Sequence, residues 1–288
     1  MRGIILLCIG KPEYKLWAHN MIVSIRANSA LPVHLVGDYP AKDWHILPDK
    51  IIPIEYGDCH VNGKISIAKA KLSLWKYSEF EETIYLDVDG LVLRELDFPI
   101  NYFLTQVNGY STLYEDNTKA NLWVKPEQVY EKYQIPEINR MPGTNSSIMA
   151  WTKKGAEVLK QALDNFSDPI PIENLRYEWG KSKQQPDELY LNIALAQMGF
   201  EPEEVKLLFT KKRRGVYSGW DEIIKSFVLC CWGGLEFNHH EISGSGSPKS
   251  GLYNKLCREN YLKAYGEDLF YDHFYSLIKS KIYEKGLL

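Results

Sequence analysis

The amino-acid sequence predicts an α/β protein whose mainly parallel, twisted sheet is flanked by helices. Segments with strand-like and helix-like patterns alternate through the first half of the chain, which is typical of a doubly wound sheet. The strand-like segment that ends at Asp87 is a short apolar run, as expected of a strand that is buried on both faces. With 288 residues, 45% of them hydrophobic, the chain is long enough for one large core or two small ones.

The first strand and helix have the clearest patterns. The apolar run Ile4–Ile9 lies inside a predicted strand, Gly3–Gly10, because it is too short for a membrane span or the apolar part of a signal peptide. A helix is predicted over Tyr14–Asn28, where apolar residues recur at the helical period. A second strand, Pro32–Gly37, ends at a glycine that is followed by an aspartate.

Three further elements precede the most unusual motif of the chain. Lys50–Glu55 is predicted as a third strand, although Pro53 weakens it because proline cannot donate a ladder hydrogen bond. Ser66–Tyr77 is predicted as a helix, since its apolar residues share one face. Thr83–Asp87 is predicted as a buried strand.

The second half is less regular. The predicted helices are Glu127–Lys132, Lys153–Phe166, Glu188–Gln197 and Leu252–Glu284, and the predicted strands are Ser146–Trp151, Val205–Phe209 and Phe227–Trp232. Ser243–Gly251 is rich in glycine and serine, which predicts a mobile loop. We therefore expect one catalytic domain over residues 1–240, and a loop followed by an aromatic helical extension over residues 241–288.

Two aspartates follow the buried strand in the segment Thr83–Leu93, which reads TIYLDVDGLVL. In an extended backbone the side chains of Asp87 and Asp89 point to the same side. Two carboxylates so close together repel each other unless a cation lies between them. Oxygen ligands favour a hard cation, Mg²⁺ or Mn²⁺, and such ions commonly bind substrate phosphates. The motif predicts a metal–phosphate site, and the alternative is a solvated turn.

Charge and cysteine content restrict the partners and the compartment. The net charge of −3 gives no electrostatic reason to expect nucleic acid as a partner. Five cysteines without regular spacing argue against a disulfide framework and for a reducing compartment, so we expect a cytoplasmic protein. No segment of the sequence reads as a transmembrane helix.

The segment Lys69–Asp97 combines a Lys-Leu-x-x-Trp helix, an apolar strand that ends in Asp-x-Asp, and a Leu-Val-Leu run followed by aspartate. The residues that form this pattern are Lys71, Leu72, Trp75, Asp87, Asp89, Leu91, Val92, Leu93 and Asp97. The pattern resembles the D-x-D region of GT-A glycosyltransferases, especially glycosyltransferase family 8, the glycogenin and galactinol-synthase type. Weaker similarities to this family lie at Tyr14, Ala18, Ser24, Gly143–Met149 and Gln185–Asn192.

The resemblance implies a GT-A fold and transfer of a hexose from a nucleotide-sugar, most often UDP-glucose or UDP-galactose, with retention at the anomeric carbon. It implies that Asp87 and Asp89 hold Mn²⁺ or Mg²⁺ against the donor phosphates. The metal and Lys71 would stabilise the leaving diphosphate. Tyr14 would stack on the nucleotide base.

Other implied site residues also have a structural explanation. Asp187 would stabilise an oxocarbenium-like transition state, but Pro-Asp-Glu also makes it a good N-cap of the helix that follows. Asn145 would contact a sugar hydroxyl group, or it is a turn residue. Gly233 and Gly234 would let the backbone approach a phosphate, or they form a turn.

The sequence departs from the family where the metal site is completed. Cys231 stands where the family has a histidine, and a thiolate is a poor ligand for Mg²⁺. We therefore expect His239 to be the third ligand, with His240, Cys231 or water as alternatives. The loop Ser243–Gly251 would then close over the donor. Glu188 replaces a glutamine of the family.

Two other functions fit parts of the sequence. The run Asp87–Gly90 also resembles the first motif of haloacid-dehalogenase phosphatases, but Leu91 stands where they have threonine or valine, and strands and helices precede the motif. A non-catalytic protein that binds a sugar nucleotide is the other alternative. The acceptor, a saccharide, lipid or protein, is left open because variable loops form its pocket. The aromatic C-terminal helix predicts internal packing or a homodimer face.

Overall fold

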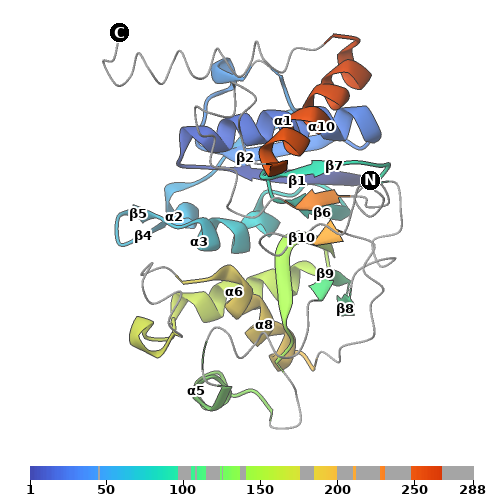
Figure 1. The fold of residues 1–288 in the computed structure, drawn as a ribbon. Coiled ribbons are helices and arrows are strands. Elements are labelled where there is room, and N and C mark those ends of the chain that lie inside the picture. The colour runs from blue at the N-terminus through green and yellow to red at the C-terminus, as the bar shows by residue number, and fades with distance from the viewer. Residues whose placement is uncertain are drawn as a thin grey trace.

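The computed structural model describes residues 1–44, 46–96, 105–107, 109–114, 124, 126–136, 141–175, 185–199, 210–211, 228–230 and 248–267. These residues include a seven-stranded sheet in the order β3-β2-β1-β6-β10-β9-β8 (Figure 1). The bounds of its strands are β1 Arg2–Cys8, β2 Val33–Gly37, β3 Lys50–Pro53, β6 Glu82–Leu86, β8 Thr105–Val107, β9 Tyr110–Tyr114 and β10 Thr144–Thr152.

The helices and the smaller strands complete the described elements. The helices are α1 Pro12–Asn28, α2 Tyr56–Cys59, α3 Ile67–Leu72, α5 Pro126–Lys132, α6 Ala156–Ser167, α8 Asp187–Gln197 and α10 Pro248–Tyr265, and the 3₁₀ turns are η1 Ala41–Asp43, η2 Leu74–Lys76 and η4 Ile172–Asn174. A hairpin joins β4 His60–Val61 to β5 Lys64–Ile65, and a second sheet contains β7 Gly90–Val92, β11 Thr210–Lys211 and β12 Val228–Cys230.

The central sheet is parallel over the predicted strand–helix units and antiparallel beyond them. Strands β3, β2, β1 and β6 pair in parallel, whereas β10 is antiparallel to both β6 and β9. The predicted α/β fold, a central sheet flanked by helices, is confirmed. The sequence predicts neither β8 nor β9, because the residues around them are polar and aromatic and do not form apolar runs.

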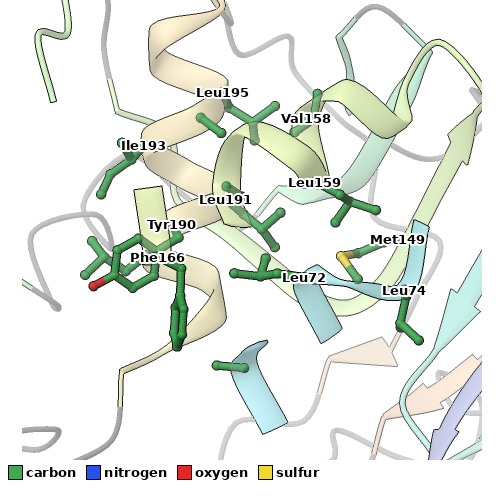
Figure 2. Packing of buried hydrophobic residues seen from close by; sticks show 14 of the residues in the cluster. Leu72, Leu74, Met149, Val158, Leu159, Phe166, Tyr190, Leu191, Ile193 and Leu195 are labelled. Atoms are coloured by element: carbon green, nitrogen blue, oxygen red, sulfur yellow. The ribbon is translucent and has the colours of Figure 1, made fainter. Parts of the chain in front are cut away.

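Helices cover both faces of the sheet, α1 and α10 on one face and α3, α6 and α8 on the other (Figure 1). Strand β1 therefore packs on both sides: Ile4 and Leu6 lie in the cluster with α1, and Ile5 lies in the cluster with α3, α6 and α8. Figure 2 shows Met149 of β10 and Leu191 of α8 in this second cluster. Burial on both faces explains why the strand is apolar from Ile4 to Cys8.

Two predicted helices differ from the observed ones by an interruption and by a late start. The helix predicted over Ser66–Tyr77 is divided at Ser73, where α3 ends and η2 begins. The helix predicted from Lys153 begins only at Ala156, because a turn precedes it in which Gly155 N–H donates to Thr152 Oγ1 at 3.1 Å. Local side-chain bonding of threonine competes here with helix formation.

The C-terminal predictions are partly wrong and partly outside the described residues. Pro248–Gly251 form the first turn of α10, not the end of a mobile loop, and proline is favoured in a first helical turn. Residues 243–247, the predicted strand at 205–209 and the predicted helix beyond residue 267 lie outside the described residues. Of the helices described, none has the length and apolar character needed to cross a membrane.

The strand order reverses direction at β1 and β6. From β1 the chain moves outward through β2 to β3, and it then returns to β6 on the other side of β1. Helix α1 follows β1 on one face, and α3 precedes β6 on the opposite face. Ligands of open α/β sheets bind at such a reversal, beyond the carboxyl ends of the strands. The motif Asp87–Asp89 directly follows the carboxyl end of β6.

The start of α6 leaves no room for a side chain at Gly155. A Cβ atom built there would lie 2.1 Å from the backbone oxygen of Gly109. We expect Gly155→Ala to lower the free energy of unfolding by roughly 1–3 kcal/mol, the usual cost of overpacking. Urea denaturation measures this change. Gly57→Ala is the matched control, because a Cβ atom at Gly57 in α2 meets nothing within 4 Å. Equal stability of the two variants would contradict the prediction.

Candidate functional site

The two aspartates of the motif lie in a turn, not in an extended strand. Strand β6 ends at Leu86, and Gly90 N–H donates to Asp87 O at 3.3 Å to close the turn. The alternation of an extended backbone therefore does not place Asp87 and Asp89 side by side, and this premise of the sequence analysis is wrong. The turn is held to β10, because Asp87 N–H donates to Ser147 O at 2.9 Å. Both aspartates are half-buried.

A buried lysine lies against this turn. Lys71 of α3 is 6% exposed, and its Nζ lies 2.9 Å from Asp87 Oδ1 and 3.3 Å from Asp187 Oδ2. It also donates to Ser146 Oγ at 3.2 Å. Helix α3 begins at a Ser66 N-cap whose side chain accepts from Lys69 N–H. The lysine thus joins three segments that are distant in the sequence.

The carboxylates keep this lysine charged. Burial alone would lower the pKa of Lys71, but Asp187 and Asp87 outweigh it and hold that pKa well above its usual value. Tyr85 lies beneath the ammonium, which is 5.4 Å from the centre of its ring, and its hydroxyl group donates to Asp87 Oδ1. Burial and the charge of Asp87 raise the pKa of Tyr85 well above its usual value, so the hydroxyl group remains a donor.

A bulge in β10 brings further polar residues to the site. Asn145 pairs with Leu113, but the next pair on β9 is Met149 with Thr112, so the residues between Asn145 and Met149 bulge out of the ladder. Thr112 Oγ1 donates to Asn145 O at 2.9 Å, and Asn145 Oδ1 accepts from Ser147 N–H at 3.0 Å. Bulges commonly redirect side chains next to active sites. Asn145 is buried in a strand, so its interpretation as a turn residue is wrong.

The first turn of α8 completes the cluster of charged and polar side chains around Lys71. The helix begins at Asp187 with Pro186 as its N-cap, so the prediction that Asp187 itself is the N-cap is wrong. Asn145 Nδ2 donates to Glu188 Oε1 at 3.0 Å, and Ser146 N–H donates to the same oxygen at 3.3 Å. Together with the ion pair to Lys71, these bonds fix the start of α8 against β10.

The cluster carries more negative than positive charge. The Lys71 ammonium faces the carboxylates of Asp87 and Asp187, and Asp89 lies in the same turn as Asp87. These hard oxygen donors with excess negative charge fit Mg²⁺ or Mn²⁺. Within the described part of the chain, no three His, Cys, Asp or Glu side chains are grouped as a ligand set. Water commonly completes the coordination of such ions.

The other predicted site residues are partly described. Tyr14 lies in the first turn of α1, with its ring 5.2 Å from that of Trp17. Because β1 and β6 are parallel and α1 follows β1, Tyr14 lies at the same edge of the sheet as Asp87. The remaining predicted residues, Gly233, Gly234, Cys231, His239 and His240, lie outside the described residues.

Two residues of the cluster are absent from the sequence prediction. Tyr85 precedes Asp87 by two positions, a spacing that could have indicated a shared face. Ser146 follows Asn145, but no local pattern shows that its hydroxyl group meets Lys71, because that contact depends on the bulge of β10.

No family model and no curated protein matches this chain. Among solved structures, the apo structure of the bifunctional glycosyltransferase WbbM is similar at 11% identity with a TM-score of 0.44, over 68% of this chain and 37% of WbbM. The galactosyltransferase LgtC, solved with donor and acceptor sugar analogues, is similar at 16% identity with a TM-score of 0.42, over 69% of this chain and 72% of LgtC. The aligned part of this chain thus spans little more than a third of WbbM.

Proposed function

We propose that this protein is a metal-dependent glycosyltransferase that moves a hexose from a nucleotide-sugar to an acceptor. The observation that carries the proposal is the buried ammonium of Lys71, which joins Asp87 to Asp187 at the carboxyl edge of β6. This position is the reversal of strand order at which α/β sheets bind their ligands. A fixed positive charge between two carboxylates suits a reaction that separates an anionic diphosphate from a cationic sugar.

Each described residue of the cluster has a role in the proposed reaction. Asp87 and Asp89 would hold Mn²⁺ or Mg²⁺, which when bound offsets charge on the diphosphate. Lys71 adds a second positive charge to the same side and stabilises the leaving group. Asp187 stabilises positive charge that develops on the sugar ring, and Asn145 orients a sugar hydroxyl group.

The finer features of the proposal come from the resemblance in the sequence. The donor is UDP-glucose or UDP-galactose, Tyr14 stacks on the base, and transfer retains the anomeric configuration. The acceptor, a saccharide, a lipid or a protein, stays open, and the expectation of a cytoplasmic protein comes from the cysteine content instead. His239, Gly233 and Gly234 would complete the metal and phosphate contacts.

A donor screen tests the proposed function. We expect one member of a panel of UDP-, GDP- and ADP-sugars, with Mn²⁺, to release free nucleotide, at least by slow hydrolysis. Mass spectrometry of the released nucleotide and sugar is the measurement. Release of phosphate from a phosphomonoester without nucleotide-sugar turnover would favour a phosphatase instead. Thermal stabilisation by UDP without turnover of any donor would favour a binding protein.

A further inference from the structure

Two side chains of α1 hold the strand that follows the aspartate turn. In β7, Val92 N–H donates to Ser24 Oγ at 2.9 Å, and Val92 O accepts from Asn28 Nδ2 at 3.0 Å. Ser24 and Asn28 lie on one face of the helix because they are four residues apart. In the described part of the second sheet, β7 is an edge strand that pairs with β12. Ser24 and Asn28 bond its other edge, as a neighbouring strand would.

Asn28 also joins this edge to the C-terminal helix α10. Its Nδ2 donates to Asn260 Oδ1 at 3.2 Å, and its Oδ1 accepts from Lys263 Nζ at 2.7 Å. Helix α10 packs along α1 (Figure 1). Val92 and Tyr261 lie in the same hydrophobic cluster on this face of the sheet. The side chain of Asn28 therefore connects α1, β7 and α10, three segments that are distant in the sequence.

The turn that carries Asp89 is anchored at both ends. At the end of β6, Asp87 N–H donates to Ser147 O at 2.9 Å. At the other end, β7 begins at Gly90, the residue directly after Asp89. Loss of the second anchor would leave Asp87 in place but release Asp89. The position of Asp89 thus depends on β7 and, through Asn28, on α10.

We propose that Asn28 is a positioning residue that couples α10 to Asp89. It acts through β7, whose free edge it bonds together with Ser24. In this role α10 supports the candidate site from the opposite end of the sequence. The effect on a cation held by Asp89 rests on the proposed function, whereas the coupling between α10 and β7 does not.

Hydrogen exchange tests the coupling without any ligand. Asn28→Ala removes the bonds of this side chain to β7 and to α10 together, so the amides of β7 should exchange about tenfold faster than in wild type. Tyr261→Phe is the matched control, because it removes a hydroxyl group that bonds Asn20 of α1 at 3.5 Å but leaves Asn28 unchanged. Mass spectrometry of peptic fragments is the measurement. Wild-type exchange in Asn28→Ala, or equally fast exchange in both variants, would overturn the role of Asn28.

A second measurement uses wild type alone in case Asn28→Ala does not fold. As urea is raised toward the unfolding transition, the amides of β7 and α10 should come to exchange through one shared opening reaction with the same dependence on urea. Opening of α10 while β7 keeps its protection would show that the two elements are not coupled.

The dependence on Mn²⁺ tests the link to Asp89. In calorimetry, the Mn²⁺ concentration needed for half-maximal UDP binding should rise about tenfold in Asn28→Ala and stay unchanged in Tyr261→Phe. Saturating Mn²⁺ should restore UDP binding, a rescue that a general loss of structure would not show. A wild-type Mn²⁺ requirement in Asn28→Ala, despite faster exchange in β7, would exclude the role toward Asp89.

The two measurements separate this inference from the proposed function. Absence of Mn²⁺-dependent UDP binding in wild type would count against the proposed function and, with it, against the effect of Asn28 on a cation. The exchange results alone would then decide whether α10 and β7 are coupled.

Discussion

Replacing Lys71 with methionine is expected to lower the free energy of unfolding by about 3–5 kcal/mol at neutral pH. Lys71 is 6% exposed, with its ammonium 2.9 Å from Asp87 Oδ1 and 3.3 Å from Asp187 Oδ2. Methionine has a similar volume but no charge, so both carboxylates would lose their cation while remaining largely shielded from water. Urea denaturation followed by tryptophan fluorescence measures the loss.

An exposed lysine provides the matched control. Lys132→Met removes a pair of similar length, 2.8 Å to Asp168 Oδ2, but the Asp168 side chain is 81% exposed. Such a surface pair contributes at most about 1 kcal/mol. Adding Asp87→Asn and Asp187→Asn to Lys71→Met should restore part of the stability, because the two carboxylates that lost their cation are then neutral as well. Equal losses for Lys71→Met and Lys132→Met would show that the buried cluster is not an ordered feature of the fold.

Asparagine at position 89 is expected to reduce donor turnover at least about 100-fold, which corresponds to about 2.7 kcal/mol of transition-state stabilisation. The amide keeps the shape of Asp89 but removes the charge proposed to hold the cation. Asp87→Asn should lose activity as well, but it also removes the ion pair to Lys71 and so lowers stability. Asp89→Asn is therefore the cleaner test of the metal role, and its Tm should stay close to that of wild type.

Calorimetry separates binding from folding in these variants. UDP binding should depend on Mn²⁺ in wild type and lose this dependence in the double variant Asp87→Asn, Asp89→Asn. Asp164→Asn, on the exposed side of α6, is the control and should bind and turn over as wild type does. If the double variant bound UDP with Mn²⁺ as tightly as wild type, the metal role of the pair would be wrong.

The parallel half of the fold could be predicted from sequence because its signals are local. Apolar residues dominate β1, β2 and the end of β6, and the helical period marks α1. The antiparallel half depends on pairing between distant segments, which no window of residues reveals. β8 and β9 are short, and β9 pairs with β10 across a bulge, so their pattern does not have a regular period of two.

The members of the candidate site could be predicted better than its geometry. Lys71, Asp87, Asn145 and Asp187 do lie together, as the resemblance implies, although their roles remain predictions. The expectation of two aspartates on an extended strand is wrong because a turn begins at Asp87. The ion pairs of Lys71 could not be foreseen, since they require α3, β6 and α8 to meet, which is a property of the whole core.

The position of β10 has a consequence for how the protein is synthesised. β10 lies between β6 and β9, yet it follows both of them along the chain. While the ribosome has delivered only the first part of the chain, one side of β6 keeps its backbone amides and carbonyls unpaired, which is a known risk for aggregation. Asp187 emerges later still, so a nascent or truncated chain that contains the aspartate motif lacks the cluster around Lys71. The protein is therefore expected to stay inactive until residues beyond 187 have left the ribosome exit tunnel.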